Sequence, residues 1–417
     1  MSRLREPRVP GPVPARALGG GKVLVAGPTG RVALLTEDEH AAFAGGLREP
    51  DPLRERLAAL GVIPEAAEPE ALARATIESG LLNWSGPVTH VVVVSARGRS
   101  MVPETAKAAV DFAFSTPRPT LFLEFVDEDG NGWPAAWFGA AYARRRAEWA
   151  GRGLALSYRS AAAPARERDE FLRGHGVAVR AALKADGAAP PAGERGAARA
   201  RVTIGPGARE PEAWVDALSS AGVSGVEWVP APELTSDPSG ARRFADFAGR
   251  ALSRLIDAHE TSDLRDELAI GLLSGRPWEI RGVDLVETLA YAPDGTVFSS
   301  EEGWALDADR SVGIFRLGHV STLRFADLPS QPVVPALVAA LAREAQPLCA
   351  SCAYRSYCLI PPSVHFRAQG SLTGRLPDSP RCAAHMALLD VVFSRLNDEK
   401  CLKALEKWGV DISRFTC

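Results

Sequence analysis

The middle of the chain alternates short apolar runs with longer segments in which apolar residues recur every three or four positions. Residues 88–96 (VTHVVVVSA) form a continuous β-branched run, which is typical of a strand buried on both faces. Similar runs occupy residues 120–126, 154–160, 177–183, 202–205 and 225–229. Helical patterns lie between the runs, among them residues 101–114 and 133–149. This alternation predicts an α/β protein with a parallel sheet, curved into a partial (β/α)6 barrel.

A different pattern precedes the barrel. Residues 22–26 and 31–36 are apolar runs separated by Gly-Pro-Thr-Gly, which predicts a β-hairpin. The next segment begins with a capping-box signal, Thr36 followed by Glu39 three positions later. Short helices are expected at residues 37–45, 52–60 and 70–80. A hairpin with three short helices predicts a small winged-helix-like module.

Shorter signals follow the barrel pattern. Residues 286–300 contain a hairpin signature with Asp294-Gly295 at the turn, and residues 313–321 are expected to pair nearby. A helix is expected at residues 385–396. Inside the barrel pattern, residues 185–200 are rich in Pro, Gly and Ala, which predicts a mobile surface loop.

The amino-acid composition argues against two classes of binding partner, nucleic acids and membranes. Lys and Arg together number 48 and Asp and Glu 51, so the net charge is −3. A nearly neutral chain is a poor binder of nucleic acid or of an anionic membrane, and we expect neither partner. The sequence has no apolar stretch long enough to span a bilayer and no apolar secretory segment near its start. These features predict a cytoplasmic protein.

The cysteines gather at one end of the sequence. All six lie at or after Cys349, and four form the pattern Cys349-x2-Cys352-x5-Cys358-x23-Cys382. Four thiolates can hold a [4Fe–4S] cluster or a tetrahedral zinc ion. Structural zinc sites usually present two tight pairs, whereas the last two cysteines here are single and widely spaced. The pattern therefore favours one [4Fe–4S] cluster, and zinc is the alternative.

With these motifs, the sequence resembles the radical SAM/SPASM peptide maturases, especially the larger radical SAM subunit of the His-Xaa-Ser peptide-modification system. Residues 349–382 resemble the family's auxiliary cluster-binding tail, and residues 293–320 resemble the hairpin that leads into it. Residues 101–125 resemble the first helix and second strand of the barrel. Residues 22–43 resemble the module that recognises peptide leaders. The resemblance implies a SPASM/twitch-like iron–sulfur region and a peptide partner.

The sequence departs from this family where the barrel would bind S-adenosylmethionine (SAM). Family members follow the first strand with C-x3-C-x2-C, but residues 97–104 read RGRSMVPE. The family's Gly-Gly-Glu-Pro motif after the second strand is replaced by EFVDEDGNGWP at residues 124–134. No cysteine precedes Cys349 to take over this role. The departure implies a degenerate barrel with no SAM-cleaving cluster and no independent radical SAM activity.

The expected organisation combines these segments. Residues 1–21 form a disordered tail, residues 22–82 the peptide-recognition module, residues 83–285 the degenerate barrel, residues 286–397 the auxiliary cluster region and residues 398–417 a C-terminal tail. The hairpin edge could accept an extended peptide as an added strand. The candidate residues for this contact are Arg31, Val32, Ala33, Leu34 and Leu35.

Other polar residues are expected to be structural, and no catalytic residue is assigned. His90 fits a buried core histidine, and neither His365 nor the remaining cysteines, Cys401 and Cys417, are expected to bind metal. The acidic residues after the second barrel strand are expected to form a solvated loop: Glu124, Asp127, Glu128 and Asp129.

Three functions stay open at this point. The favoured one is a catalytically degenerate subunit that binds a precursor peptide, an active radical SAM partner protein, or both, during peptide maturation. The second is an enzyme with altered chemistry that uses the cluster for electron transfer or substrate ligation. The third is a zinc-stapled structural scaffold.

Overall fold

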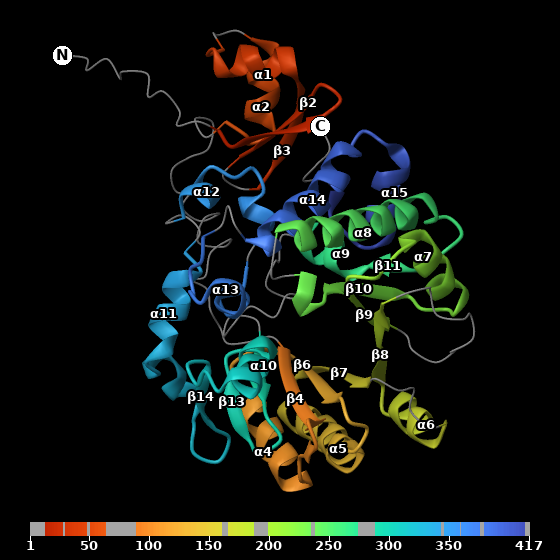
Figure 1. The fold of residues 1–417 in the computed structure, drawn as a ribbon, viewed down its shortest axis with the longest axis vertical. Coiled ribbons are helices and arrows are strands. Elements are labelled where there is room, and N and C mark those ends of the chain that lie inside the picture. The colour runs from red at the N-terminus through yellow and green to blue at the C-terminus, as the bar shows by residue number, and fades with distance from the viewer. Residues whose placement is uncertain are drawn as a thin grey trace, which may run out of the picture.

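A large, mainly parallel sheet forms the centre of the molecule (Figure 1). The computed structural model describes residues 13–27, 30–47, 51–63, 89–160, 166–186, 199–234, 238–273, 288–342, 346–358, 360–375 and 379–412. Six parallel strands pair side by side in chain order: β4 (Thr89–Ala96), β6 (Thr120–Asp127), β7 (Gly153–Ser160), β8 (Val177–Ala185), β9 (Arg199–Ile204) and β10 (Gly225–Pro230). The predicted α/β fold and its six barrel strands are confirmed.

Helices cover the outer face of this sheet. They are α4 (Pro103–Phe114), α5 (Trp133–Ala150), α6 (Arg166–Gly174), α7 (Pro211–Ser220), α8 (Pro238–Asp257) and α9 (Glu267–Leu273), with a short 3-10 helix η3 (Pro232–Leu234). The buried face of α5 consists of small residues, and a Cβ on Gly139 would lie 2.6 Å from Cε1 of Phe125 on β6. Glycine at this position therefore lets α5 lie close against the sheet.

The sheet does not end at the expected boundary between residues 285 and 286. β12 (Thr288–Tyr291) pairs in parallel with β4, and β13 (Thr296–Phe298) and β14 (Arg316–His319) extend the same sheet antiparallel. The two-residue strands β5 (Arg99–Ser100) and β11 (Arg265–Asp266) also join it. The predicted hairpin and its pairing with residues 313–321 are confirmed, but they belong to the barrel sheet. Helix α10 (Glu301–Arg310) lies between β13 and β14, and η4 (Phe325–Ser330) and α11 (Val333–Ala340) follow β14.

The N-terminal sheet has three antiparallel strands, β1 (Ala15–Gly19), β2 (Lys22–Ala26) and β3 (Val32–Thr36). The predicted hairpin is confirmed, but β1 lies inside the expected disordered tail 1–21. That expectation is wrong for β1. The sequence of β1 shows little strand pattern, but its backbone N–H and C=O groups form hydrogen bonds with β2. Helices α1 (Glu37–Ala44) and α2 (Pro52–Ala59) follow. Thr36 and Glu39 form the predicted capping box.

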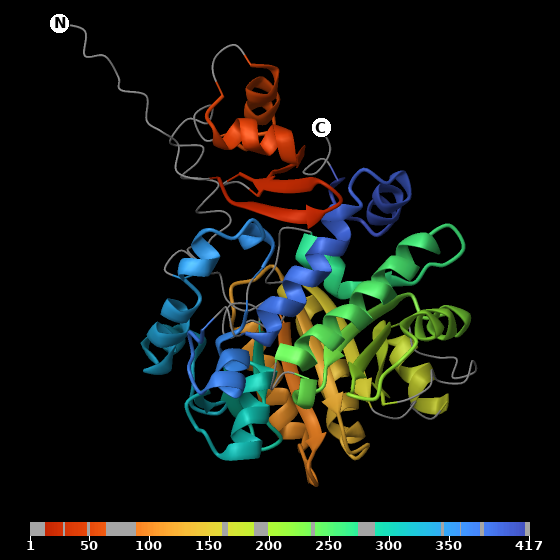
Figure 2. The same cartoon turned by 45° about the horizontal axis from the view of Figure 1, so that its top comes forward.

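The N-terminal sheet packs on the C-terminal part of the chain (Figure 2). Leu24 and Val32 share a core with Tyr354 and Phe393. The C-terminal elements are α12 (Pro347–Ala350), η6 (Arg355–Tyr357), α13 (Pro362–Gln369), α14 (Pro380–Ser394) and α15 (Glu399–Lys407). The expected tail 398–417 is wrong for α15, since Cys401 and Leu405 are fully buried in that core.

Several expectations fall outside the described residues. These are the tail at residues 1–12, the third helix of the N-terminal module at residues 70–80, most of the loop at residues 185–200, and Cys417. The winged-helix interpretation therefore stays a prediction. Among the helices that the structure describes, none combines the length and apolarity needed to cross a membrane.

Candidate functional site

The four patterned cysteines line one cavity of about 40 Å³. Cys349 lies on α12, Cys352 directly after it, Cys358 after η6, and Cys382 in the first turn of α14. The space exceeds the roughly 10–15 Å³ that one water molecule needs. Apolar side chains make up much of the remaining wall: Leu341, Leu348, Ile360 and Leu389. Short elements that are separate in the sequence thus bring all four thiols together.

The sulfur atoms already have polar neighbours. The Tyr354 backbone N–H donates to Cys352 Sγ at 3.4 Å, and Cys358 Sγ lies 3.2 Å from His385 Nδ1. Burial, reinforced by the other three thiols, raises the pKa of Cys382 to about 12. A metal that binds here would therefore displace protons from these thiols.

The incompletely compensated charge of Arg381 indicates whether an anionic metal cluster would fit beside this residue. Its Nε is buried without a hydrogen-bond partner, and its charge interacts favourably with Glu227 and Cys358. Burial lowers the Arg381 pKa, because the charge is incompletely compensated. A cluster held by four thiolates carries negative charge and would compensate it, so the residues present fit such a group. Within the described ranges, no three His, Cys, Asp or Glu side chains are arranged around a single metal ion.

His365 also lines the cavity and is buried, which lowers its pKa to about 4. The other histidine considered from the sequence, His90, is fully buried on β4, and its Nδ1 lies 2.6 Å from the Tyr291 hydroxyl. Burial lowers the His90 pKa to about 3, so the ring is neutral. The expected core role of His90 is confirmed.

The first barrel strand ends in a two-residue turn. Ala96 and Arg99 pair across the β4–β5 hairpin, with Arg97 and Gly98 between them at φ 56° and 75°. Asp129, from the loop after β6, accepts a hydrogen bond from the Gly98 N–H at 2.6 Å. The segment that would carry three cysteines in the resembling family is thus a tight hairpin.

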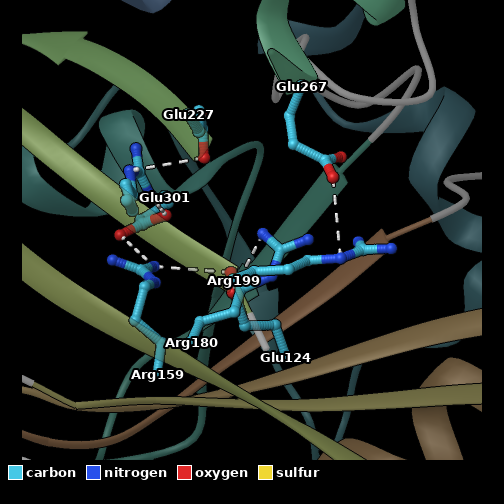
Figure 3. Close-up of polar contacts among 8 residues, drawn as sticks. Glu124, Arg159, Arg180, Arg199, Glu227, Glu267 and Glu301 are labelled. Carbon is cyan, nitrogen blue, oxygen red and sulfur yellow. Dashed lines mark hydrogen bonds and ion pairs between the residues drawn. The ribbon is translucent and has the colours of Figure 1, made fainter. Parts of the chain in front are cut away.

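A network of charged side chains fills the inner face of the barrel (Figure 3). Its members come from β6 to β10 and from the first residues of α9 and α10: Glu124, Arg159, Arg180, Arg199, Arg201, Glu227, Glu267 and Glu301. The shortest ion pair joins Arg159 Nη2 to Glu301 Oε1 at 2.7 Å. Burial opposes the ionisation of Glu301, but Arg159 and Arg201 outweigh it and lower the Glu301 pKa to about 2.

The expected solvated acidic loop is wrong for two of its four residues. Glu124 is 7% exposed and lies 3.5 Å from both Arg159 and Arg180, whereas Asp127 is fully buried. Asp127 accepts hydrogen bonds from the Tyr158 hydroxyl at 2.6 Å and the Gly132 N–H at 3.0 Å. The two buried carboxylates are tolerated here because hydrogen-bond donors and arginines from neighbouring elements contact them.

Sequence reasoning missed the arginines of this network. Arg159, Arg180, Arg199 and Arg201 each interrupt an otherwise apolar strand pattern. A charged residue at an inward position of a buried strand is unusual, and its recurrence on three consecutive strands was the available signal.

The candidate peptide edge is part of β3, which ends the three-stranded sheet. No strand that the structure describes pairs with its outer side. The side chains of Val32, Ala33 and Leu35 are buried, whereas Arg31 is exposed and Leu34 is half-buried. A bound peptide would therefore contact mainly the backbone of this edge. The residue before the segment, Gly30, accepts a hydrogen bond from the Tyr357 hydroxyl, next to Cys358.

Comparisons with known proteins identify a shared fold. No family model matches the chain, and no curated protein matches it. Similar solved structures include native anSMEcpe, an anaerobic sulfatase-maturating enzyme, with bound AdoMet, at a TM-score of 0.58 and 9% identity over 75% of this chain and 99% of that one. Hexahistidine-tagged anSMEcpe with AdoMet gives a TM-score of 0.57 and 10% identity over 77% and 99%.

A third similar structure is native anSMEcpe with AdoMet and the Kp18Cys peptide, at a TM-score of 0.57 and 10% identity over 75% of this chain and 99% of that one. Identities this low establish the fold alone. The chain therefore has a fold similar to that of a radical SAM enzyme, as the sequence predicted, and the more specific resemblance to the His-Xaa-Ser system stays a prediction.

Proposed function

We propose that this protein is a catalytically degenerate homologue of the radical SAM/SPASM peptide maturases, acting as a peptide-binding or partner subunit. It would hold one auxiliary [4Fe–4S] cluster through Cys349, Cys352, Cys358 and Cys382 and would not cleave SAM. The observation that carries the proposal is the tight turn at Arg97 and Gly98, which leaves the barrel site without thiols while the four cysteines share one cavity.

The cysteine cavity suits a redox or structural cluster. When bound, such a cluster supplies one-electron transfer. The chain's own contribution is to exclude water with apolar walls and to direct a backbone N–H at Cys352. Four thiols are present for four metal positions, which favours complete protein ligation over direct substrate binding.

Metal content is the first test. After anaerobic purification and reconstitution, we expect about four irons with matching sulfide per chain. Cys382→Ser should lose most of this iron, whereas Cys401→Ser, a buried thiol outside the cavity, should retain it. About one zinc and no iron would contradict the cluster and support the zinc scaffold.

Enzymatic activity is the second test. The reconstituted protein, supplied with a strong reductant and SAM, should release no 5′-deoxyadenosine. Release of 5′-deoxyadenosine, together with an iron content that corresponds to two clusters per chain, would contradict the degenerate barrel.

Peptide binding through β3 is the third test, with a precursor peptide encoded beside this protein as the probe. Alternate N–H groups of an edge strand point away from its neighbour, so one of Ala33→Pro and Leu34→Pro removes an outward donor. The variant that loses an outward N–H should keep its melting temperature and lose peptide binding. The variant that loses an N–H bonded to β2 should have a lower melting temperature. Unchanged peptide binding in both folded variants would contradict the edge-strand contact.

A further inference from the structure

Three arginines form a row across the inner face of the barrel. The strand register places Arg159 of β7 beside Arg180 of β8, and Arg180 beside Arg199 of β9. Residues at matching positions of adjacent parallel strands point to the same face of a sheet. Like charges side by side are destabilising, so this row needs compensation.

The carboxylates around the row contact its three arginines unequally. Arg159 has a hydrogen bond to Glu301 at 2.7 Å. Arg180 is 3.5 Å from Glu124, and Arg199 is 3.6 Å from Glu267. Contacts this long are at or beyond the limit of a hydrogen bond. The Nε atoms of Arg159 and Arg180 are buried without a hydrogen-bond partner.

The electrostatic balance differs along the row. Burial lowers the pKa of Arg159, but Glu301 and Glu124 outweigh it and raise that pKa above its usual range. Burial lowers the pKa of Arg199, and the neighbouring Arg180 and Arg265 lower it further, although Glu267 opposes them. The Arg180 and Arg199 side chains keep 27% and 35% of their surface exposed, so a ligand can reach them from solvent. Their planar donor groups match the two oxygens of a carboxylate.

We propose that Arg180 and Arg199, with Arg159 at the end of the row, bind the carboxylates of an acidic peptide segment inside the barrel. This inference rests on the proposed peptide-binding function and specifies the class of peptide: one that presents Glu or Asp side chains to the barrel. The incoming carboxylates supply the hydrogen bonds that Glu124 and Glu267 leave unmade.

Calorimetric titration of the full-length protein tests the proposal, with N-acetylated, C-amidated triglutamate and triglutamine peptides as probes. Triglutamate should bind about tenfold more tightly than triglutamine, because charge-assisted hydrogen bonds are about twice as strong as neutral ones. Arg180→Gln and Arg199→Gln should each weaken triglutamate binding about tenfold. Arg250→Gln, at an exposed ion pair on α8, should leave it unchanged.

Two further measurements keep the test decisive. If Arg180→Gln lowers the melting temperature, Arg180→Lys retains the charge and should bind triglutamate with intermediate affinity. Equal affinity for the two peptides, or binding of inorganic phosphate without binding of triglutamate, would overturn the proposal. If triglutamate fails to bind while the precursor peptide still binds through β3, only the arginine row is refuted. If both fail, the peptide-binding part of the proposed function fails as well.

Discussion

At the scale of single residues, Arg381 carries an incompletely compensated charge next to the candidate ligand Cys382. Its buried Nε has no partner, so the apoprotein carries a cost that an anionic cluster would offset. We expect Arg381→Met to stabilise the apoprotein by about 1 kcal/mol, measured by urea unfolding. After reconstitution, the same variant should lose iron to a chelator faster than wild type. A destabilised apoprotein would show that Arg381 is already paired.

Asp266 gives the fold a pH dependence with a definite sign. It accepts a hydrogen bond from the Ala269 N–H at 2.8 Å, and burial raises its pKa from 3.8 to about 7. The folded protein therefore retains a proton that the unfolded chain has released between about pH 4 and pH 7. The protonated Asp266 carboxyl therefore makes its full contribution to the free energy of unfolding below this range. The contribution is lost as pH rises through the range, because the buried carboxyl must then ionise.

Asp266→Asn keeps the acceptor oxygen and removes the titration. Relative to wild type, the variant should gain stability as pH rises, by about 1 kcal/mol for each pH unit in that range. Urea unfolding at pH 5 and pH 8 measures the difference. A difference independent of pH would contradict the raised pKa.

Among the secondary-structure elements, the β4–β5 turn requires glycine. Gly98 has φ 75°, a conformation that disfavours side chains. Gly98→Ala should reduce the free energy of unfolding by about 1 kcal/mol, because alanine is strained there. Gly174→Ala is the matched control, since a Cβ on Gly174 would meet open space and its φ is not positive. Equal stability of the two variants would argue against a strained turn.

The elements differ in how far the sequence could predict them. The six barrel strands were predictable because each is a local apolar run, and the α1 capping box was predictable from Thr36 and Glu39 alone. The position of β12 beside β4 was not, because that pairing joins residues about 200 positions apart and has no local signal. Likewise, Glu124 was assigned to solvent because its arginine partners lie on other strands.

At the scale of the whole molecule, a charged long-range contact ties β1 to α14. Arg16 Nε and Nη2 lie 2.5 Å from the two carboxylate oxygens of Asp390, and the Tyr354 hydroxyl donates to the same carboxylate at 2.5 Å. Asp390→Asn should cost about 2 kcal/mol, because it leaves a half-buried guanidinium without its countercharge. Amide hydrogen exchange in β1 and β2 should become faster.

Asp257→Asn provides the control for this prediction, since Asp257 is half exposed and its ion pair is with Arg395 rather than with a residue of the N-terminal sheet. Its exchange in β1 and β2 should match wild type. Unchanged exchange in the Asp390 variant would mean that apolar packing alone holds the sheet in place.

The cysteine site itself was predictable as a pattern of spacing, but its surroundings were not. Arg381 follows Pro380 without any local signal in the sequence, and only folding brings its charge within range of Cys358 and the barrel residue Glu227. The cavity wall likewise combines α11, α12 and α14, which no local periodicity connects.

The contact between Arg16 and Asp390 joins residues 374 positions apart, so it also constrains the order of events during synthesis. The ribosome releases β1 to β3 long before α14 is synthesised. The apolar face of this small sheet therefore stays exposed to solvent until α14 can pack against it. The last of the four cavity cysteines, Cys382, emerges with α14. Closure of the N-terminal sheet over the C-terminal helices must therefore follow the synthesis of α14, as must loading of the proposed cluster, and a chain truncated before α14 would expose an uncovered sheet.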